Sequence, residues 1–204
     1  SDLISCGYIY RKDRVRPYGE PQYAYHDTTN HYHYRLVACG FEDIQSNERF
    51  VLNINHLRSK RGTGKESNAK RMTNVDSLLV MLHNIQENQI FHDTDILLVG
   101  DYNCYTQEQP IQTLIQNGYE DLVMQYDSTG YSYVYHSEAG YLDRVFASPT
   151  MAKQVKMVRP YHLNTDYFYS RGFKRGLDKT IFRYADHDPI LISIQLVPNH
   201  IHHD

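Results

Sequence analysis

Residues 95–103 have the sequence DILLVGDYN, an apolar run followed by glycine and polar residues. The short apolar run over residues 95–99 is typical of a strand that is buried on both of its faces. Gly100, Asp101 and Asn103 follow it directly, at the point where such a strand leaves its sheet. We therefore predict a buried strand with candidate functional side chains at its carboxyl end.

Two helices are predicted around this strand. The longer one carries a single apolar stripe, because its apolar residues recur at three- and four-residue steps. The stripe consists of Met72, Val75, Leu78, Leu79, Leu82 and Ile85. Residues 58–67 contain two glycines and many charges and are predicted as a loop. A shorter helix is predicted from near Pro110, a favoured first-turn residue, to Gly118.

Several short strands complete the pattern of elements. They are predicted over residues 3–10, 34–41, 49–55, 131–135, 141–147, 155–158 and 190–197. Residues 137–140 are predicted as the turn of a hairpin. Many short strands with only two helices indicate an α+β sandwich and not a regular series of βαβ units.

Length and composition exclude several classes of protein. A chain of 204 residues folds as one domain and can bury roughly 70% of its unfolded surface. Its apolar runs are far shorter than a membrane span. Cys6, Cys39 and Cys104 show no CxxC spacing, and an odd number of cysteines cannot close a complete disulfide framework. Membrane-spanning proteins, zinc ribbons and small disulfide scaffolds are therefore excluded.

Basic residues concentrate in two short windows although the formal net charge is −3. The windows contain Arg58, Lys60, Arg61, Lys65, Lys70 and Arg71, and then Arg171, Lys174, Arg175, Lys179 and Arg183. Such windows are either solvated loop charge or a surface for a polyanion. The tyrosines at positions 102, 105 and 131 can add base stacking, although core packing is the commoner role of a tyrosine.

Polar groups recur at three predicted strand ends. Residues 55–56 are Asn-His, residues 100–103 are GDYN, and residues 185–189 are ADHDP. Each group alone is explained by turn formation or by a structural hydrogen bond. Together they supply carboxylates that suit a hard divalent ion, and imidazoles that can transfer protons.

Four motifs in this order resemble the endonuclease/exonuclease/phosphatase superfamily, which includes pancreatic-type deoxyribonucleases, apurinic endonucleases and sphingomyelinases. They are NHLRSK at 55–60, GDYN at 100–103, GYLDR at 140–144 and DHDP at 186–189. The closest resemblance is to the superfamily's bacterial secreted extracellular nucleases. It rests on the longer strings at 10–11, 57–62, 140–148 and 162–166.

The resemblance implies an α+β fold, a four-layer α/β sandwich of two packed mixed sheets flanked by helices. It also implies the catalytic residues. His187 resembles the catalytic imidazole and Asp143 the carboxylate that orients it, while His56 lies on the opposite side of the scissile phosphate. Asp101 belongs to the same catalytic set, and Asp2 resembles the acidic partner of His56.

The same resemblance implies a divalent metal ion as cofactor, with Mg²⁺ preferred and Mn²⁺ or Ca²⁺ as alternatives. Asp101, Asn103 and Asp186 are its implied ligands, and Asn103 is also implied in catalysis. The implied substrate-binding residues are Arg35, Arg58, Lys60 and Arg61.

Residues 1–198 are expected to form one domain of this type, and residues 199–204 a flexible tail. The superfamily's first strand and its metal-binding glutamate have no counterpart in this sequence. We therefore expect the chain to be the C-terminal portion of the domain, lacking the N-terminal strands, with an upstream segment of the same precursor as partner. The resemblance further implies a bacterial extracellular or periplasmic location.

The sequence leaves three functions open. The first is metal-dependent hydrolysis of phosphodiesters in DNA or RNA by an extracellular nuclease. The second is a phosphoesterase of the same fold that acts on a phospholipid or a phosphorylated small molecule. The third is a catalytically silent fragment that binds nucleic acid.

Overall fold

The computed structural model describes residues 5–24, 35–61, 64–167 and 182–196. Six strands form the larger sheet: β1 (Val15–Tyr23), β2 (Leu36–Asp43), β3 (Arg49–His56), β4 (Ile96–Asp101), β8 (Asp143–Ala147) and β5 (Glu120–Asp121). They lie side by side in that order. β3 and β4 are parallel and every other neighbouring pair is antiparallel, so the sheet is mixed.

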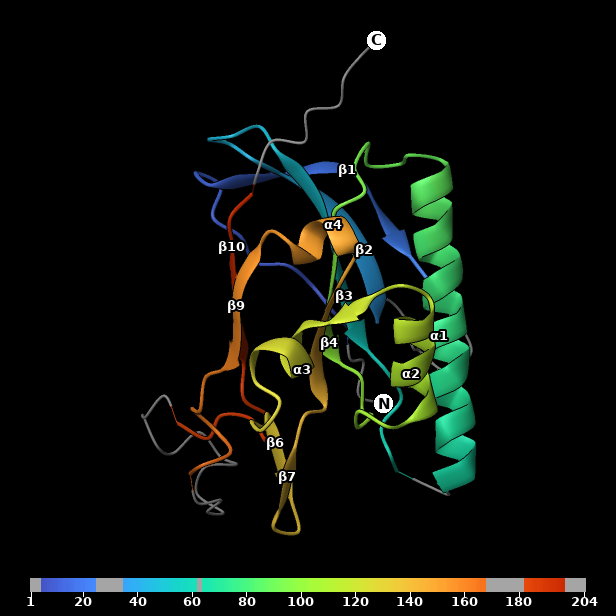
Figure 1. Ribbon diagram of the computed structural model, residues 1–204, viewed down its shortest axis with the longest axis vertical. Coiled ribbons are helices and arrows are strands. Elements are labelled where there is room, and N and C mark those ends of the chain that lie inside the picture. The colour runs from blue at the N-terminus through green and yellow to red at the C-terminus, as the bar shows by residue number, and fades with distance from the viewer. Residues whose placement is uncertain (1–4, 25–34, 62–63, 168–181, 197–204) are drawn as a thin grey trace.

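Two helices, α1 (Gly64–Glu87) and α2 (Gln109–Gln116), cover one face of this sheet (Figure 1). The predicted stripe of α1 is confirmed, because Val75, Leu78, Leu82 and Ile85 are buried in the core beneath the sheet. The helix begins at Gly64, so the last residues of the predicted loop are helical. Since α1 connects two parallel strands, it brings the ends of β3 and β4 to the same edge of the sheet.

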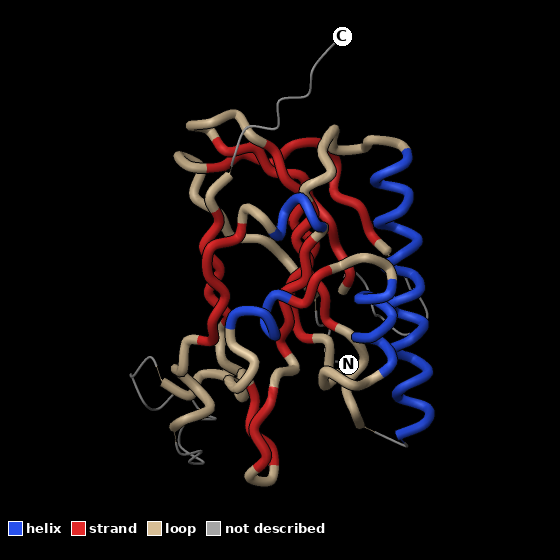
Figure 2. Tube along the Cα trace, viewed as in Figure 1, coloured by secondary structure: helices blue, strands red, loops and turns tan. Residues whose placement is uncertain are grey.

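A second sheet lies on the other face and consists of β9 (Val155–Pro160) and β10 (Ile190–Ile194). Figure 2 shows the helices α1 and α2, the larger sheet and this pair as successive layers. Two short helices, α3 (Leu122–Tyr126) and α4 (Pro149–Ala152), contact β8. The predicted α+β sandwich is confirmed. We expected the second sheet to be mixed as well. Among the described residues it is antiparallel, because its two strands, β9 and β10, run in opposite directions.

A hairpin of β6 (Tyr133–Tyr135) and β7 (Glu138–Gly140) projects from the body of the molecule (Figure 1). Its turn is His136-Ser137, and both residues have positive φ angles, of 50° and 68°. This two-residue turn matches the twist of the flanking strands. The turn predicted over 137–140 was wrong, because residues 138–140 pair with β6 instead.

The strand predicted over residues 3–10 was also wrong, since residues 5–14 form no strand. Tyr8 lies across the larger sheet instead, with its ring 5.4 Å from that of Phe41. Its hydroxyl lies 2.8 Å from the Val37 carbonyl oxygen and 2.7 Å from that of Leu52. The ring and hydroxyl of Tyr8 therefore make the contacts to the sheet that we expected from backbone hydrogen bonds. The first described strand is β1, whose two prolines are tolerated because β1 lies at the edge of the sheet.

Some expectations concern residues outside the described ranges. These are Asp2, most of the second basic window and the tail at 199–204. All three cysteines are described, and each is an unpaired thiol. Within the described residues, no helix has the length and apolar character needed to cross a membrane.

Candidate active site

Three candidate residues lie in one row across the edge of the larger sheet. His56 of β3 is paired in register with Asp101 of β4, and Asp101 is paired with Asp143 of β8. Directly paired residues project to the same face of a sheet. Val99 and Val145, two residues from Asp101 and Asp143, pack in the core under the second sheet. The row therefore faces the space between the two sheets at its open end.

The close approach of β3 and β4 depends on Gly100. Its φ angle is +137°, and a Cβ atom at this position would lie 1.9 Å from the Asn55 carbonyl oxygen. The Asn55 amide is buried and donates a hydrogen bond of 2.8 Å to the Tyr102 hydroxyl. Tyr102 is 0% exposed, so it belongs to the core and is excluded as a stacking residue.

Asn103 holds the Asp101 carboxylate in place. Its backbone N–H donates to Asp101 Oδ1 over 2.7 Å, and its side-chain Nδ2 donates to Oδ2 over 2.9 Å. The same Nδ2 donates to the Leu57 carbonyl oxygen over 3.2 Å. The φ angle of Asn103 is 50°, a left-handed conformation that asparagine tolerates better than most residues. The loop after β4 is thus shaped around Asp101.

His187 reaches the row from the segment before β10. Its Nδ1 lies 2.7 Å from Asp143 Oδ2, which also accepts a 2.7 Å hydrogen bond from the Ser132 hydroxyl. Ser132 is 0% exposed. Ser132 was not among the predicted site residues, because one serine in a tyrosine-rich segment carries no local signal. A β-bridge between Tyr133 and His187 explains how the chain brings these residues together.

Asp188 fixes the segment that carries His187. Its Oδ1 accepts hydrogen bonds from three successive backbone N–H groups, at residues 163–165. Its Oδ2 lies 2.8 Å from His162 Nδ1. The string at 162–166 therefore forms a clamp around the residue that follows the candidate catalytic histidine.

The titratable groups of the row have displaced pKa values. Burial and then the charge of Asp143 raise the pKa of Asp101 to about 7. Burial alone would lower the pKa of His187, but the hydrogen bond and charge of Asp143 raise it to about 9. Burial, then the charges of Arg35 and His187, lower the pKa of His56. His56 and Asp101, 3.6 Å apart, are therefore not a full ion pair near neutral pH.

The donor set suits a metal ion. Ligand atoms of Asp101, Asp143 and His187 all lie within 4.8 Å of one another. Two carboxylates so close repel each other, and a cation between them would relieve that repulsion. Asn103 contacts Asp101. Asp186 is exposed, and its charge contributes to the raised pKa values of Asp101 and His187.

Arg35 precedes β2, and the other three predicted substrate-binding residues lie in the segment that follows His56. The Arg35 carbonyl oxygen accepts a 2.9 Å hydrogen bond from the His56 N–H. Arg35, which directly precedes β2, therefore lies next to His56 at that end of the row. Lys60 pairs with Glu108, and its Nζ lies 4.8 Å from the ring centroid of Tyr105. Arg61 is exposed. Arg58 follows β3 closely, and its carbonyl oxygen accepts a hydrogen bond from a buried arginine of α1.

A cavity of about 390 Å³ opens beside this basic loop. It is lined by Lys60, Arg71 and Glu108 together with the first turn of α1. The row of His56, Asp101 and Asp143 is not part of its lining. The cavity is therefore distinct from the candidate catalytic residues.

No protein-family model and no curated protein sequence matches this chain significantly. Solved structures do match. A mannosyl-6-phosphatase of Bacteroides thetaiotaomicron has a TM-score of 0.62 and 16% identity, covering 92% of this chain and 69% of its own. An AP endonuclease of Archaeoglobus fulgidus has a TM-score of 0.62 and 10% identity, covering 89% and 72%.

An endonuclease/exonuclease/phosphatase family protein of Bacteroides thetaiotaomicron has a TM-score of 0.58 and 15% identity. The match covers 89% of this chain and 65% of that one, so this chain spans about two thirds of that protein's length. Identities this low show a shared fold, and the shared fold is the one that the four motifs implied. The chain has the fold of the endonuclease/exonuclease/phosphatase proteins.

Proposed function

We propose that this protein hydrolyses phosphodiester bonds of nucleic acid with the help of a divalent metal ion. One observation carries the proposal. Two imidazoles stand at opposite ends of a carboxylate pair, and their pKa values are displaced in opposite directions. Pairs of titratable groups whose environments separate their pKa values are typical of acid–base catalysis.

The two imidazoles have complementary roles in this proposal. His56 is neutral at pH 7 and accepts a proton from the water whose oxygen bonds to phosphorus. His187 is protonated at pH 7 and donates a proton to the oxygen that leaves as the phosphorus–oxygen bond breaks. Proton transfer of this kind contributes about 10²–10⁴ in rate. Asp143 orients His187 and stabilises its protonated form.

A divalent ion, for which we propose Mg²⁺, would be held by Asp101 and Asp143 with Asn103 and Asp186 nearby. When bound, it supplies positive charge to the phosphate oxygens. Mn²⁺ and Ca²⁺ favour the same oxygen donors and are the alternatives.

Basic side chains favour a nucleic acid over a small phosphoester. Arg35 adjoins His56, and Arg58, Lys60 and Arg61 lie in the segment that follows His56, where a polyanionic backbone can contact them. A phosphomonoesterase is the second candidate, because the mannosyl-6-phosphatase and the AP endonuclease resemble this fold with the same TM-score. Binding without catalysis is the third.

The test measures hydrolysis of supercoiled plasmid, bis(p-nitrophenyl) phosphate and mannose 6-phosphate, each with Mg²⁺ and with a chelator. We expect Mg²⁺-dependent cleavage of the first two, and loss of cleavage in His187→Gln and His56→Gln. The matched control is His83→Gln, since His83 lies exposed on α1. Hydrolysis of mannose 6-phosphate alone would favour the second candidate, and plasmid binding without any hydrolysis the third.

We further propose an extracellular or periplasmic location, on the basis of the resemblance of the strings at 140–148 and 162–166 to secreted nucleases. Fractionation of the producing cells tests this. Recovery of the protein in the cytoplasmic fraction alone would contradict it.

A further inference from the structure

Three tyrosine rings lie on one face of the β6–β7 hairpin. Tyr133 is paired in register with Gly140, and a Cβ atom on Gly140 would lie 2.9 Å from the Tyr105 ring. Since paired residues project to the same face, the Tyr105 ring lies beside Tyr133 in the space that Gly140 leaves open. The Tyr135 ring is 6.2 Å from that of Tyr133, with 10° between their planes.

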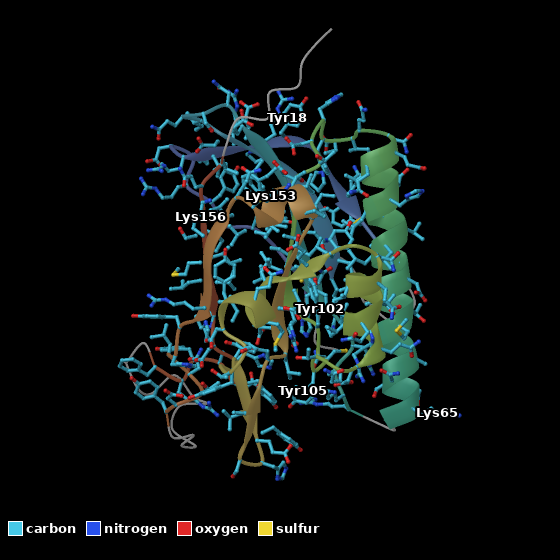
Figure 3. The ribbon with its side chains drawn as sticks, in the orientation of Figure 1. Tyr18, Lys65, Tyr102, Tyr105, Lys153 and Lys156 are labelled. Atoms are coloured by element: carbon cyan, nitrogen blue, oxygen red, sulfur yellow. The ribbon has the colours of Figure 1, made fainter. Side chains whose placement is uncertain are left out.

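These rings are not core residues. Tyr135 is 57% exposed, whereas Tyr102 in the core is 0% exposed. Tyr105 and Tyr133 are partly exposed. Figure 3 shows Tyr105 near the base of the hairpin, lower in the view than Tyr102. The packing of the domain therefore does not account for the outermost ring.

The row of rings begins at the candidate catalytic site. The Tyr133 ring centroid is 4.5 Å from that of His187, and Lys60 Nζ is 4.8 Å from the centroid of Tyr105. The tyrosine rings thus extend outward from the proposed reaction centre, and the Lys60 ammonium group lies beside the ring of Tyr105. Aromatic rings beside cations are the usual way in which proteins hold single-stranded nucleic acid.

The spacing of the rings decides between a duplex and a single strand. Stacked nucleotides of a duplex rise about 3.4 Å each, so neighbouring bases cannot each cover one of two rings 6.2 Å apart. The unstacked bases of a single strand can each cover one of these two rings. Glu138 is paired with Tyr135 on this face. Its carboxylate repels phosphate, so we expect a base and not the phosphate backbone to contact the ring of Tyr135. Resting on the proposed function, we infer that Tyr133 and Tyr135 stack on successive unpaired bases of a single-stranded nucleic acid substrate.

The test measures binding in the presence of a chelator, by fluorescence anisotropy of a labelled oligothymidine and of a duplex of equal length. Tyr135→Leu should weaken binding of the single strand about fivefold or more, about 1 kcal/mol for one stacked base, and change duplex binding less than about twofold. Tyr135→Phe keeps the ring and should bind as the wild type does. Tyr23→Leu is the matched control, since Tyr23 is an exposed tyrosine of the edge strand β1.

Hydrolysis of bis(p-nitrophenyl) phosphate separates this inference from the proposed function. Tyr135→Leu should leave its kcat/KM unchanged, because this substrate has no row of bases. Unchanged single-strand binding in Tyr135→Leu, or an equal loss for single strand and duplex, would overturn the stacking role. A wild-type protein that binds the single strand through Tyr135 but hydrolyses nothing would refute the proposed function alone.

Discussion

The ionised Asp101 carboxylate should lower the free energy of unfolding of the metal-free protein, and Asp101→Asn should remove this destabilisation. The Asp101 side chain is 20% exposed, and burial and the charge of Asp143 raise its pKa to about 7. A carboxyl group whose pKa is raised on folding favours the folded state below its unfolded pKa. That contribution is lost as the pH rises through the folded pKa. The loss therefore falls between about pH 4 and about pH 7.

The size of this cost follows from the two pKa values. Between the usual value near 3.9 and about 7, at about 1.36 kcal/mol for each pKa unit, the cost reaches about 4 kcal/mol. The amide introduced by Asp101→Asn would still accept the hydrogen bond from the Asn103 backbone but would lose the one from Asn103 Nδ2, worth about 1 kcal/mol. We therefore expect the Asp101→Asn protein to be about 3 kcal/mol more stable than the wild type above pH 7.

Urea unfolding with a chelator, at about pH 4 and about pH 8, measures this difference. The advantage of Asp101→Asn should be present at the higher pH and absent at the lower one. Asp76→Asn, which removes an exposed carboxylate from α1, should change the free energy of unfolding by less than about 0.5 kcal/mol at both. Equal destabilisation of Asp101→Asn at both pH values would refute the reasoning.

Further substitutions test the contacts of Asp143 and those of Glu108 in the cavity beside the basic loop. Asp143→Asn should lower the pKa of His187 from about 9; nuclear magnetic resonance of its ring protons measures this, and an unchanged titration would contradict the role of Asp143. Since that pKa is raised on folding, the wild type should also lose stability as the pH rises from about 6.5 through about 9, and the variant should lose less. Ser132→Ala should lower the free energy of unfolding by about 1 kcal/mol, and a hydrolysis rate equal to that of the wild type would argue against its support of Asp143. Glu108→Ala should cost roughly 3 kcal/mol in urea unfolding because it leaves the buried Arg71 without its carboxylate, and Glu108→Gln should cost less.

Local patterns were sufficient to predict the elements that position the candidate site. The apolar run at 96–99 and the stripe of α1 depend on burial of contiguous residues, so their periodicity is visible in the sequence. Polar residues at the ends of β3 and β4 then follow as candidates. Their convergence needs only that the two strands be parallel, which the helix between them makes possible.

Elements that depend on contacts between distant residues were not predictable in this way. Tyrosine is common in strands, which made a strand around Tyr8 plausible. In the structure the Tyr8 ring packs on Phe41, and residues 5–14 form no strand. The pairing of β6 with residues 138–140 depends on a turn of two residues without glycine, an unusual choice for positive φ angles. Ser132 becomes a candidate site residue only through its hydrogen bond to Asp143 in the folded structure.

The cost of Asp101 also explains why a metal ion suits this site. The charge of Asp143 raises the cost of ionising Asp101, and a divalent ion that binds the folded protein repays part of that cost. At a Mg²⁺ concentration of about 100 times its Kd, the wild type should gain about 2.7 kcal/mol of stability. Asp101→Asn should gain much less, because one charged ligand is absent. Titration with Mg²⁺ at about pH 8 should therefore narrow the difference between the two proteins. A difference that stays constant would show that the repulsion between Asp101 and Asp143 is not what the ion relieves.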